Sequence, residues 1–359
     1  MTNGRTLALR AALALLFGFV LNSAVSADTL DDRYTALWQP NSYLCEATPG
    51  GLKFPSRPTG EKQPCDDGDM TLFNGLLCAA GESLGCVGVK EALDRNTGKW
   101  YRSPRIRLNG NDRGGASFSP DMALGVQLYL VKTKDIDSAW RWLMWLHSHV
   151  PCWVETDGTC VVQAPAPRFC TDPPKPGDSQ NFECTVRPGD AAALSATVSW
   201  LQEKAGMQAL PNGTLRAYLG SFSGKAPGLL KLSAECNEPG FSQHLVAVGI
   251  LLERMMGSTD PALKEAAKLL TTGTLRNCDP LKRAEFQTMG DPNNAFFMFM
   301  VEGPTPVVRD QVLARCPEPG RLPTPPLHQW QWERKDADKA WEHSSYWDCV
   351  FMYRILRPN

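Results

Sequence analysis

The sequence predicts an all-α fold in which an inner ring of buried helices is surrounded by an outer ring of exposed helices. Six segments are apolar nearly all round, which is typical of helices buried on every side. Each segment begins at a polar residue, and these residues are separated by 52, 69, 54, 50 and 54 positions, as expected of a repeated unit. The six polar positions are Asp69, Asp121, Asp190, His244, Asn294 and Asp348.

The inner helices follow these positions directly. Their predicted ranges are 69–82, 121–131, 190–202, 244–256, 294–303 and 348–356. The segments between them carry charges on one face and large apolar residues on the other, which predicts exposed amphipathic helices. These outer ranges are 82–94, 137–149, 214–222, 261–270 and 306–314. The stretch 30–38 is expected to fill the sixth outer position and close the ring.

This alternation resembles the six-hairpin, or α/α toroid, superfamily, whose members include glucoamylase-like and cellulase-like hydrolases and several polysaccharide lyases. The resemblance is one of architecture and covers nearly all of residues 28–359. It implies a single (α/α)6 toroid domain with a substrate cleft where the N-termini of the inner helices converge. The six polar residues would lie at that end, although fold alone does not define function.

Residues 1–27 predict a cleavable secretory signal. Arg5 and Arg10 precede an apolar run over 11–20, and Val25-Ser26-Ala27 offers the small residues at which signal peptidase cleaves. No later apolar stretch reaches the ~20 residues needed to span a bilayer. We therefore expect a secreted or periplasmic protein with no stable membrane insertion.

All 12 cysteines follow the signal, and an even count in an exported chain favours disulfides over metal binding. There is no CxxC or HExxH motif, so no metal and no cofactor are expected. The longest repeat contains a Cys- and Pro-rich insertion at about 151–188, which predicts bridges within it. The expected pairs are Cys152–Cys160, Cys170–Cys184, Cys45–Cys65 and Cys78–Cys86.

Charge and aromatic content favour a carbohydrate partner. Removing Arg5 and Arg10 from 37 Lys and Arg leaves 35 against 38 Asp and Glu, a net charge of −3 without the clustered basic stripe that nucleic acid requires. The chain has 11 Trp, and flat aromatic faces can stack on sugar rings. We expect a monomer that binds carbohydrate and no nucleic acid.

The candidate catalytic residues are Asp69, Asp121, Asp348 and His244. Glycoside hydrolysis needs one carboxylic acid and one carboxylate, and crowded carboxylates separate each other's pKa values. The alternative for each position is helix capping, which Asp and Asn favour. At three of the helix starts a neighbouring residue is expected to be the cap, namely Asp67, Ser119 and Asp291. The polar residue of the repeat is then not needed for capping and remains available for another role.

The candidate substrate-binding residues lie near the same predicted helix starts. Arg and aromatic side chains at a cleft suit sugar oxygens or an acidic ligand. The alternatives are that the Arg residues pair with nearby acids and that the Trp residues are packing plugs between helices. The candidates are Asp67, Trp100, Tyr101, Arg102, Arg105, Asn294, Trp330, Trp332 and Trp347.

The sequence thus predicts an exported carbohydrate-active enzyme, a glycoside hydrolase with paired carboxylates. One alternative is a polysaccharide lyase that acts by β-elimination on a uronate polymer, with Arg102 or Asn294 neutralising the carboxylate and Tyr101 or His244 taking the proton. Another is a non-catalytic secreted module that binds glycans or protein partners. There is no GxSxG elbow and no isolated Cys beside a His, which disfavours nucleophilic Ser or Cys hydrolysis.

Overall fold

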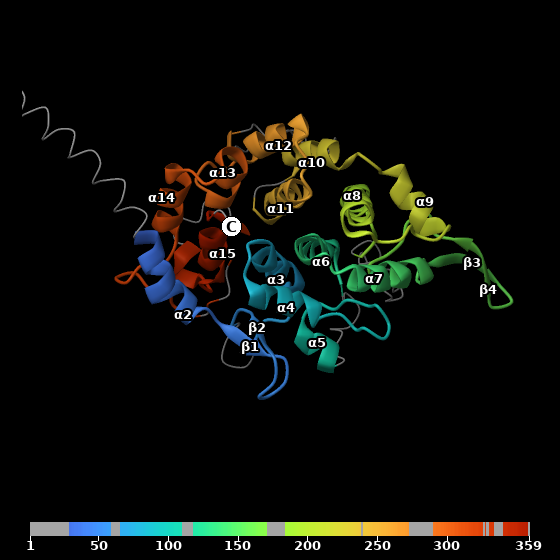
Figure 1. Ribbon diagram of the computed structural model, residues 1–359, viewed down its shortest axis with the longest axis horizontal. Coiled ribbons are helices and arrows are strands. Elements are labelled where there is room, and N and C mark those ends of the chain that lie inside the picture. Colours follow the sequence, from blue (N-terminus) through green and yellow to red (C-terminus); the bar gives the residue numbers. More distant parts are fainter. Residues whose placement is uncertain are drawn as a thin grey trace, which may run out of the picture.

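The computed structural model describes residues 29–58, 65–109, 118–170, 184–237, 240–272, 290–325, 327, 330–333 and 340–357. This part of the chain is mostly helical, with two short antiparallel hairpins, and it is disulfide-bonded (Figure 1). The prediction of a mainly helical, disulfide-bonded protein is therefore confirmed. The predicted signal segment 1–27 lies outside the described residues. None of the described helices is long and apolar enough to cross a membrane.

The six predicted inner helices are all present. They are α3 (Met70–Ala79), α6 (Pro120–Thr133), α8 (Pro188–Ala205), α11 (Phe241–Met255), α13 (Ala295–Glu302) and α15 (Trp347–Ile355). Each of the six polar residues lies at the N-cap or within the first four residues of its helix. The repeat interval read from the sequence therefore marked real helix starts.

Between these helices lie shorter or more exposed ones. They are α4 (Ser83–Lys90), α5 (Pro104–Asn109), α7 (Ile136–Ser148), α9 (Thr214–Ser221), α10 (Ala226–Cys236), α12 (Pro261–Thr272) and α14 (Pro306–Arg315). The five predicted amphipathic helices correspond to α4, α7, α9, α12 and α14. Helices α5 and α10 were not predicted, so α8 and α11 are joined through two helices instead of one.

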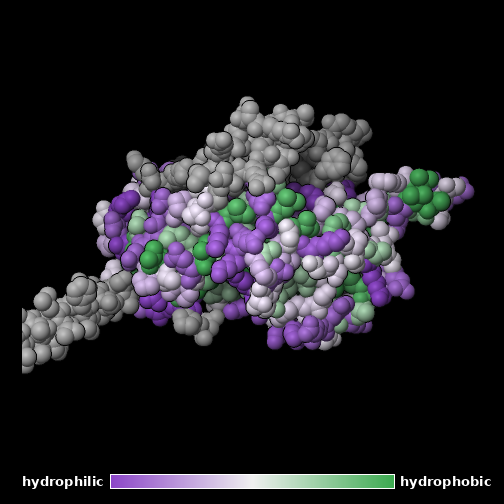
Figure 2. Space-filling model, turned by 90° about the horizontal axis from the view of Figure 1, so that it is seen from above, coloured by the Kyte–Doolittle hydropathy of each residue, from purple (hydrophilic) through white to green (hydrophobic). Residues whose placement is uncertain are grey.

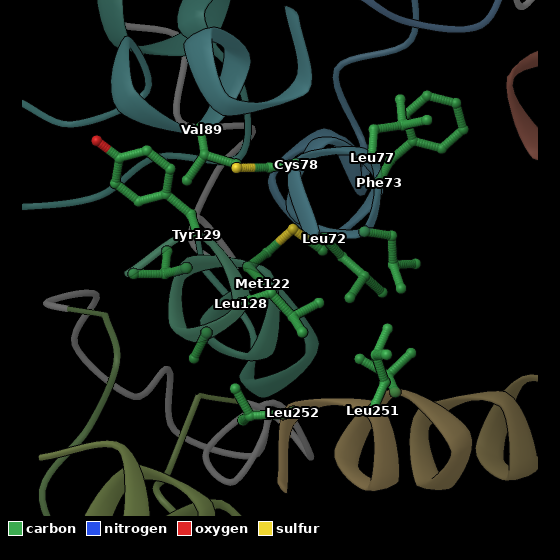
Figure 3. Close-up of a cluster of buried hydrophobic side chains, with 14 of the residues drawn as sticks. Leu72, Phe73, Leu77, Cys78, Val89, Met122, Leu128, Tyr129, Leu251 and Leu252 are labelled. Carbon is green, nitrogen blue, oxygen red and sulfur yellow. The ribbon is translucent and has the colours of Figure 1, made fainter. Parts of the chain in front are cut away.

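Helices α3 and α6 touch backbone to backbone. A Cβ placed on Gly75 would lie 2.3 Å from the carbonyl oxygen of Gly125, and one on Gly125 would lie 2.2 Å from that of Thr71. Only glycine permits this approach, because any larger residue would push the helices apart. Figure 3 shows Leu72 of α3 and Met122 of α6 at this contact, with leucines of α11 packed beneath. The contact fixes the N-terminal ends of α3 and α6 beside each other.

Helices α3, α11 and α15 meet around Trp330, whose side chain is fully buried. Its ring contacts Phe73 of α3 at 4.8 Å, His244 of α11 at 6.4 Å and Phe351 of α15 at 5.3 Å between centroids. Phe296 of α13 in turn contacts His244 and Phe351. The N-terminal ends of α3, α11, α13 and α15 therefore lie on the same side of the molecule.

The beginning and end of the described chain pack together. Residues 29–33 are helical and continue into η1 (Tyr34–Trp38) and α2 (Gln39–Asn41), and η1 packs against α15. Tyr34 stacks on Tyr353 with 3.7 Å between ring centroids, and Arg357 forms an ion pair with Asp31. A small hairpin, β1 (Leu44–Glu46) and β2 (Lys53–Pro55), follows and packs on α4.

All four expected disulfides are present, and the structure adds Cys316–Cys349, which ties α14 to α15. Cys236 is also disulfide-bonded, and no cysteine is free in the part of the chain that the structure describes. These bridges fit the expectation of an oxidising compartment.

The predicted insertion contains a hairpin and not only a loop. Its strands are β3 (Cys152–Thr156) and β4 (Thr159–Gln163), joined by a turn at Asp157 and Gly158 with φ of 52° and 73°. Every residue of both strands is exposed, and Trp153 is 68% exposed. Figure 2 shows the hairpin projecting from the body with hydrophobic residues at its surface.

Short 3-10 turns complete the described elements. They are η4 (Gln331–Glu333) and η5 (Ala340–His343), which precede α15.

Candidate functional site

Asp69 occupies the N-cap position of α3, and its side chain makes no capping hydrogen bond. The side chain is 42% exposed and forms an ion pair with Arg102 at 3.1 Å. Partial burial raises the pKa of the Asp69 carboxyl above its ordinary value, and the nearby charge of Asp121 raises it further, while Arg57 and Arg102 oppose both effects. Asp69 is therefore held close to a second carboxylate.

Asp67 is not the cap of α3, which corrects the prediction. It accepts a hydrogen bond from the Ser103 hydroxyl at 2.8 Å, and it forms an ion pair with Arg105 at 3.4 Å. These contacts hold the loop before α5 against the loop before α3. Arg102 and Arg105 are thus each paired with an aspartate, as the alternative interpretation of these residues expected. Neither guanidinium is left free to bind a ligand by itself.

Asp121 lies at the second position of α6, with Ser119 at the N-cap and Pro120 at the first helical residue, as predicted. Within the described part of the chain, its carboxylate has no hydrogen bond and no ion pair. The positive end of the helix dipole favours a negative charge at this place. Asp121 lines a cavity, so its carboxylate is available to a bound molecule.

Asp190 completes the cluster at the third position of α8. Its side chain is 14% exposed and accepts hydrogen bonds from the backbone N–H and from Nε of Arg187, both at 3.0 Å. Burial raises the pKa of the Asp190 carboxyl; Arg187 opposes this shift and the charge of Asp121 adds to it. Asp190 is one of the six repeat positions but is not among the predicted catalytic residues. Its equivalence to Asp69 and Asp121 in the repeat was the available signal.

A cavity of about 290 Å³ lies between α6, α8, α10 and α11. Asp121, Arg187 and Asp190 line it together with Asn237 and Ser242, and the remaining wall is largely aliphatic. A concave, mostly apolar site with a few convergent polar groups is typical of small-molecule binding. Asp121 belongs to this wall and also raises the pKa values of two neighbouring carboxyl groups, so the cavity and the aspartate cluster form one site.

His244 does not face the cavity, which corrects its prediction as a catalytic base. The ring is fully buried against Phe241, Phe296 and Trp330. Burial lowers its pKa to about 3, and the nearby backbone of Trp332 offsets this only in part, since neither ring nitrogen has a partner in hydrogen-bond geometry. A neutral, enclosed imidazole is a packing residue here.

Asp348 is also buried, with no exposed surface. Its carboxylate accepts hydrogen bonds from the Ser344 hydroxyl at 2.6 Å and from the backbone N–H of Cys349 at 3.1 Å. These bonds organise the turn that enters α15. Its prediction as a cleft-facing catalytic carboxylate is therefore not supported, because the group is enclosed by its own helix start.

Asn294, and not Asp291, caps α13. Its side-chain oxygen accepts from the backbone N–H groups of Phe296 at 3.1 Å and Phe297 at 3.2 Å, and its amide donates to the Trp332 carbonyl at 3.0 Å. Every polar atom of the side chain is thus engaged in the fold. The capping alternative accounts for Asn294, and its prediction as a substrate-binding residue is not supported.

The four candidate tryptophans are core residues. Trp100, Trp330, Trp332 and Trp347 are each at most 3% exposed. Three of them donate their indole N–H to a backbone carbonyl: Trp100 to Val89, Trp332 to Asp348, and Trp347 to Tyr43. This burial fits the packing alternative, since an enclosed ring offers no face to a sugar.

Tyr101 is half-buried, and the Lys99 ammonium lies 4.7 Å from the centre of its ring. The described residues contain no group of three His, Cys, Asp or Glu side chains arranged to hold a metal ion. Comparisons of the sequence with protein-family models, and of the chain with curated proteins and solved structures, found no match.

Proposed function

We propose that this protein is an exported glycoside hydrolase that acts on a polysaccharide or oligosaccharide through paired carboxylates. The observation that carries the proposal is the aspartate cluster at the N-terminal ends of α3, α6 and α8. Its central member, Asp121, has no partner in the described chain and borders a cavity. Two neighbouring aspartates have pKa values raised by burial and by the charge of Asp121.

We also propose that the helices form an (α/α)6 toroid. Helix contacts support a closed inner ring in the order α3, α6, α8, α11, α13, α15 and back to α3. Within this set α6 also packs directly against α11, so part of the ring's interior is filled. The cavity described above lies between α6, α8 and α11 of this ring and α10, which packs outside it.

In this mechanism Asp190 is the general acid and Asp121 the carboxylate that activates water or attacks the sugar. Asp190 is the more enclosed of the two neighbours of Asp121, and its raised pKa favours the protonated form that can donate to a departing oxygen. Asp69 keeps its ion pair with Arg102 and lies outside the cavity wall. In this mechanism Asp69 does not contact the substrate.

A non-catalytic glycan-binding module is the second candidate. Trp330 fills the space between α3, α11 and α15, as expected of a toroid whose central funnel is closed. No observation favours a lyase, because His244 is enclosed and Arg102 is paired with Asp69. Activity measurements decide between hydrolase and module.

The test is a screen of reducing-end release from neutral and acidic glycans by wild type, Asp121→Asn and Asp190→Asn. Both variants should lose roughly 100-fold to 10,000-fold in rate, as is typical when an acid or base is removed. Asp121→Asn should lower stability by less than ~1 kcal/mol, because the carboxylate has no partner in the described chain and loses only its favourable place at the helix N-terminus. Asp190→Asn should cost about 1 kcal/mol through its weakened cap.

The matched control is Asp137→Asn at the start of α7, whose side chain is 65% exposed and which follows the C-terminal end of α6, the end opposite Asp121. This variant should cleave at the wild-type rate. A wild-type protein that cleaves no glycan in the panel, or two cluster variants with full activity, would refute the hydrolase proposal and leave the binding module.

A further inference from the structure

Glu253 is a buried carboxyl group whose surroundings do not satisfy it. The residue lies near the C-terminal end of α11 and is 6% exposed. It lines the same cavity as Asp121 and Asp190, and its Oε1 atom has no hydrogen-bond partner. Burial raises the pKa of this carboxyl, while Ser258 opposes the shift and Asp260 adds to it. A buried polar atom without a partner costs free energy, and a bound molecule could satisfy it.

The cavity is elongated along α10 and α11. Ser242 and Glu253 both line it, and they are about three turns apart on α11, which corresponds to roughly 16 Å along the helix axis. Helix α10 runs antiparallel beside them: Asn237 at its C-terminal end donates to the Ser242 carbonyl at 3.3 Å, and Leu230 packs against Gly249 further along. Asp121 and Asp190 therefore lie at one end of this elongated cavity and Glu253 at the other. We call the elongated cavity the slot.

The charge of the lining selects against acidic ligands. Among the described residues of the lining, the acids Asp121, Asp190 and Glu253 face one cation, Arg187, which is already paired with Asp190. A uronate placed along the slot would bring its carboxylates beside these three acidic groups, and the described lining offers no unpaired guanidinium to neutralise them. Hydroxyl groups can instead donate to or accept from a carboxyl group in either protonation state.

We propose that the slot binds a linear glycan chain without carboxylate groups, and that Glu253 is a substrate-binding residue that hydrogen-bonds a sugar hydroxyl at the end distant from Asp121. This inference rests on the proposed function, since it names the substrate class of the same site. According to this inference, the wall formed by α10 and α11 determines the length and the charge of the glycan chain that binds. The aspartate cluster at the other end would perform the bond cleavage.

The test is isothermal titration calorimetry, which requires no turnover. The probes are cellotetraose, maltotetraose, xylotetraose and tetragalacturonate, titrated into the full disulfide-bonded protein carrying Asp121→Asn, so that a bound chain is not consumed. At least one neutral tetrasaccharide should bind, and tetragalacturonate should not. In the same background Glu253→Ala should weaken that binding about 10-fold, as expected for loss of one hydrogen bond to an enclosed polar group.

Two further variants separate binding from folding. Glu253→Gln should restore most of the affinity, because its amide oxygen can take the same hydroxyl. Glu203→Ala on α8, whose side chain is 71% exposed, should bind as tightly as the parent. Preferred binding of tetragalacturonate, absence of binding by all three neutral chains, or unchanged affinity in Glu253→Ala would overturn the inference.

The outcome is distinguishable from that of the proposed hydrolase. If neutral chains bind in a Glu253-dependent way and the wild-type protein does not cleave them, the substrate assignment stands and the hydrolase proposal fails. If wild type cleaves a glycan and Glu253→Ala leaves both KM and affinity unchanged, the hydrolase stands and the role of Glu253 fails.

Discussion

Replacement of Gly125 by alanine should destabilise the protein by forcing α3 and α6 apart. The added Cβ would lie 2.2 Å from the carbonyl oxygen of Thr71 and 2.5 Å from Cα of Leu72. Both are backbone atoms, so no side-chain rotation can relieve the contact. Ordinary contacts begin at 3.4 Å, and the helices must therefore separate by roughly 1 Å at this point.

The magnitude follows from two opposing effects. Overpacking a well-packed interior typically costs about 1–3 kcal/mol, and a rigid backbone neighbour favours the upper end of that range. Alanine gains about 1 kcal/mol over glycine from helix propensity. The expected net loss in the free energy of unfolding is therefore about 2 kcal/mol.

Urea unfolding at constant pH, with the disulfides intact, measures this difference through the transition midpoint. The matched control is Gly228→Ala in α10, where an added Cβ would meet nothing within 4 Å. It should be neutral or up to about 1 kcal/mol more stable. If Gly125→Ala gained the same stability as Gly228→Ala, the close helix contact would be refuted as a packing constraint.

The remaining predictions concern the buried imidazole of His244 and two of the disulfides. Because burial lowers the pKa of His244 to about 3, the unfolded chain binds a proton below about 6.5 that the folded chain does not, so stability present above pH 6.5 is lost toward pH 3 at up to ~1.4 kcal/mol per pH unit. His244→Phe should remove that slope between pH 7.5 and 5 in urea unfolding, and parallel pH profiles would contradict it. Removal of the Cys316–Cys349 bridge, which closes 33 residues within the core, should cost about 3–4 kcal/mol. Removal of Cys152–Cys160 should change global unfolding by less than ~1 kcal/mol, because its hairpin is wholly exposed and adds little to the core; equal losses for both bridges would be evidence against this account.

Helix positions were predictable from the sequence because burial on all sides leaves a strong signal. The run from Met70 to Ala79 has no polar face, and neither does that from Ala295 to Met300. Helix α10 was not predicted, because its first turn contains Pro227 and Gly228, which are residues typical of a loop. The β3–β4 hairpin was not predicted, although Asp157-Gly158 is a strong hairpin-turn signal, because the short spacing of Cys152 and Cys160 also fits a loop closed by a disulfide.

The candidate site was predictable only in part. Asp121 could be separated from helix capping because Ser119-Pro120 already supplies a helix start. The same argument failed for Asn294, since Asp291 and Asn294 are both competent caps and only three-dimensional geometry selects one. Glu253 gave no signal at all, because a glutamate late in a helix normally points to solvent and its burial depends on the packing of α10.

The contact between the two ends of the described chain has a kinetic consequence. Tyr34 stacks on Tyr353 and Asp31 pairs with Arg357, so each of these contacts bridges more than 300 residues of sequence. Contacts this distant form late, because the entropy of closing the intervening loop opposes them until most of the chain is ordered. The helical segment that begins at residue 29 should therefore dock late in folding, after α15 has formed.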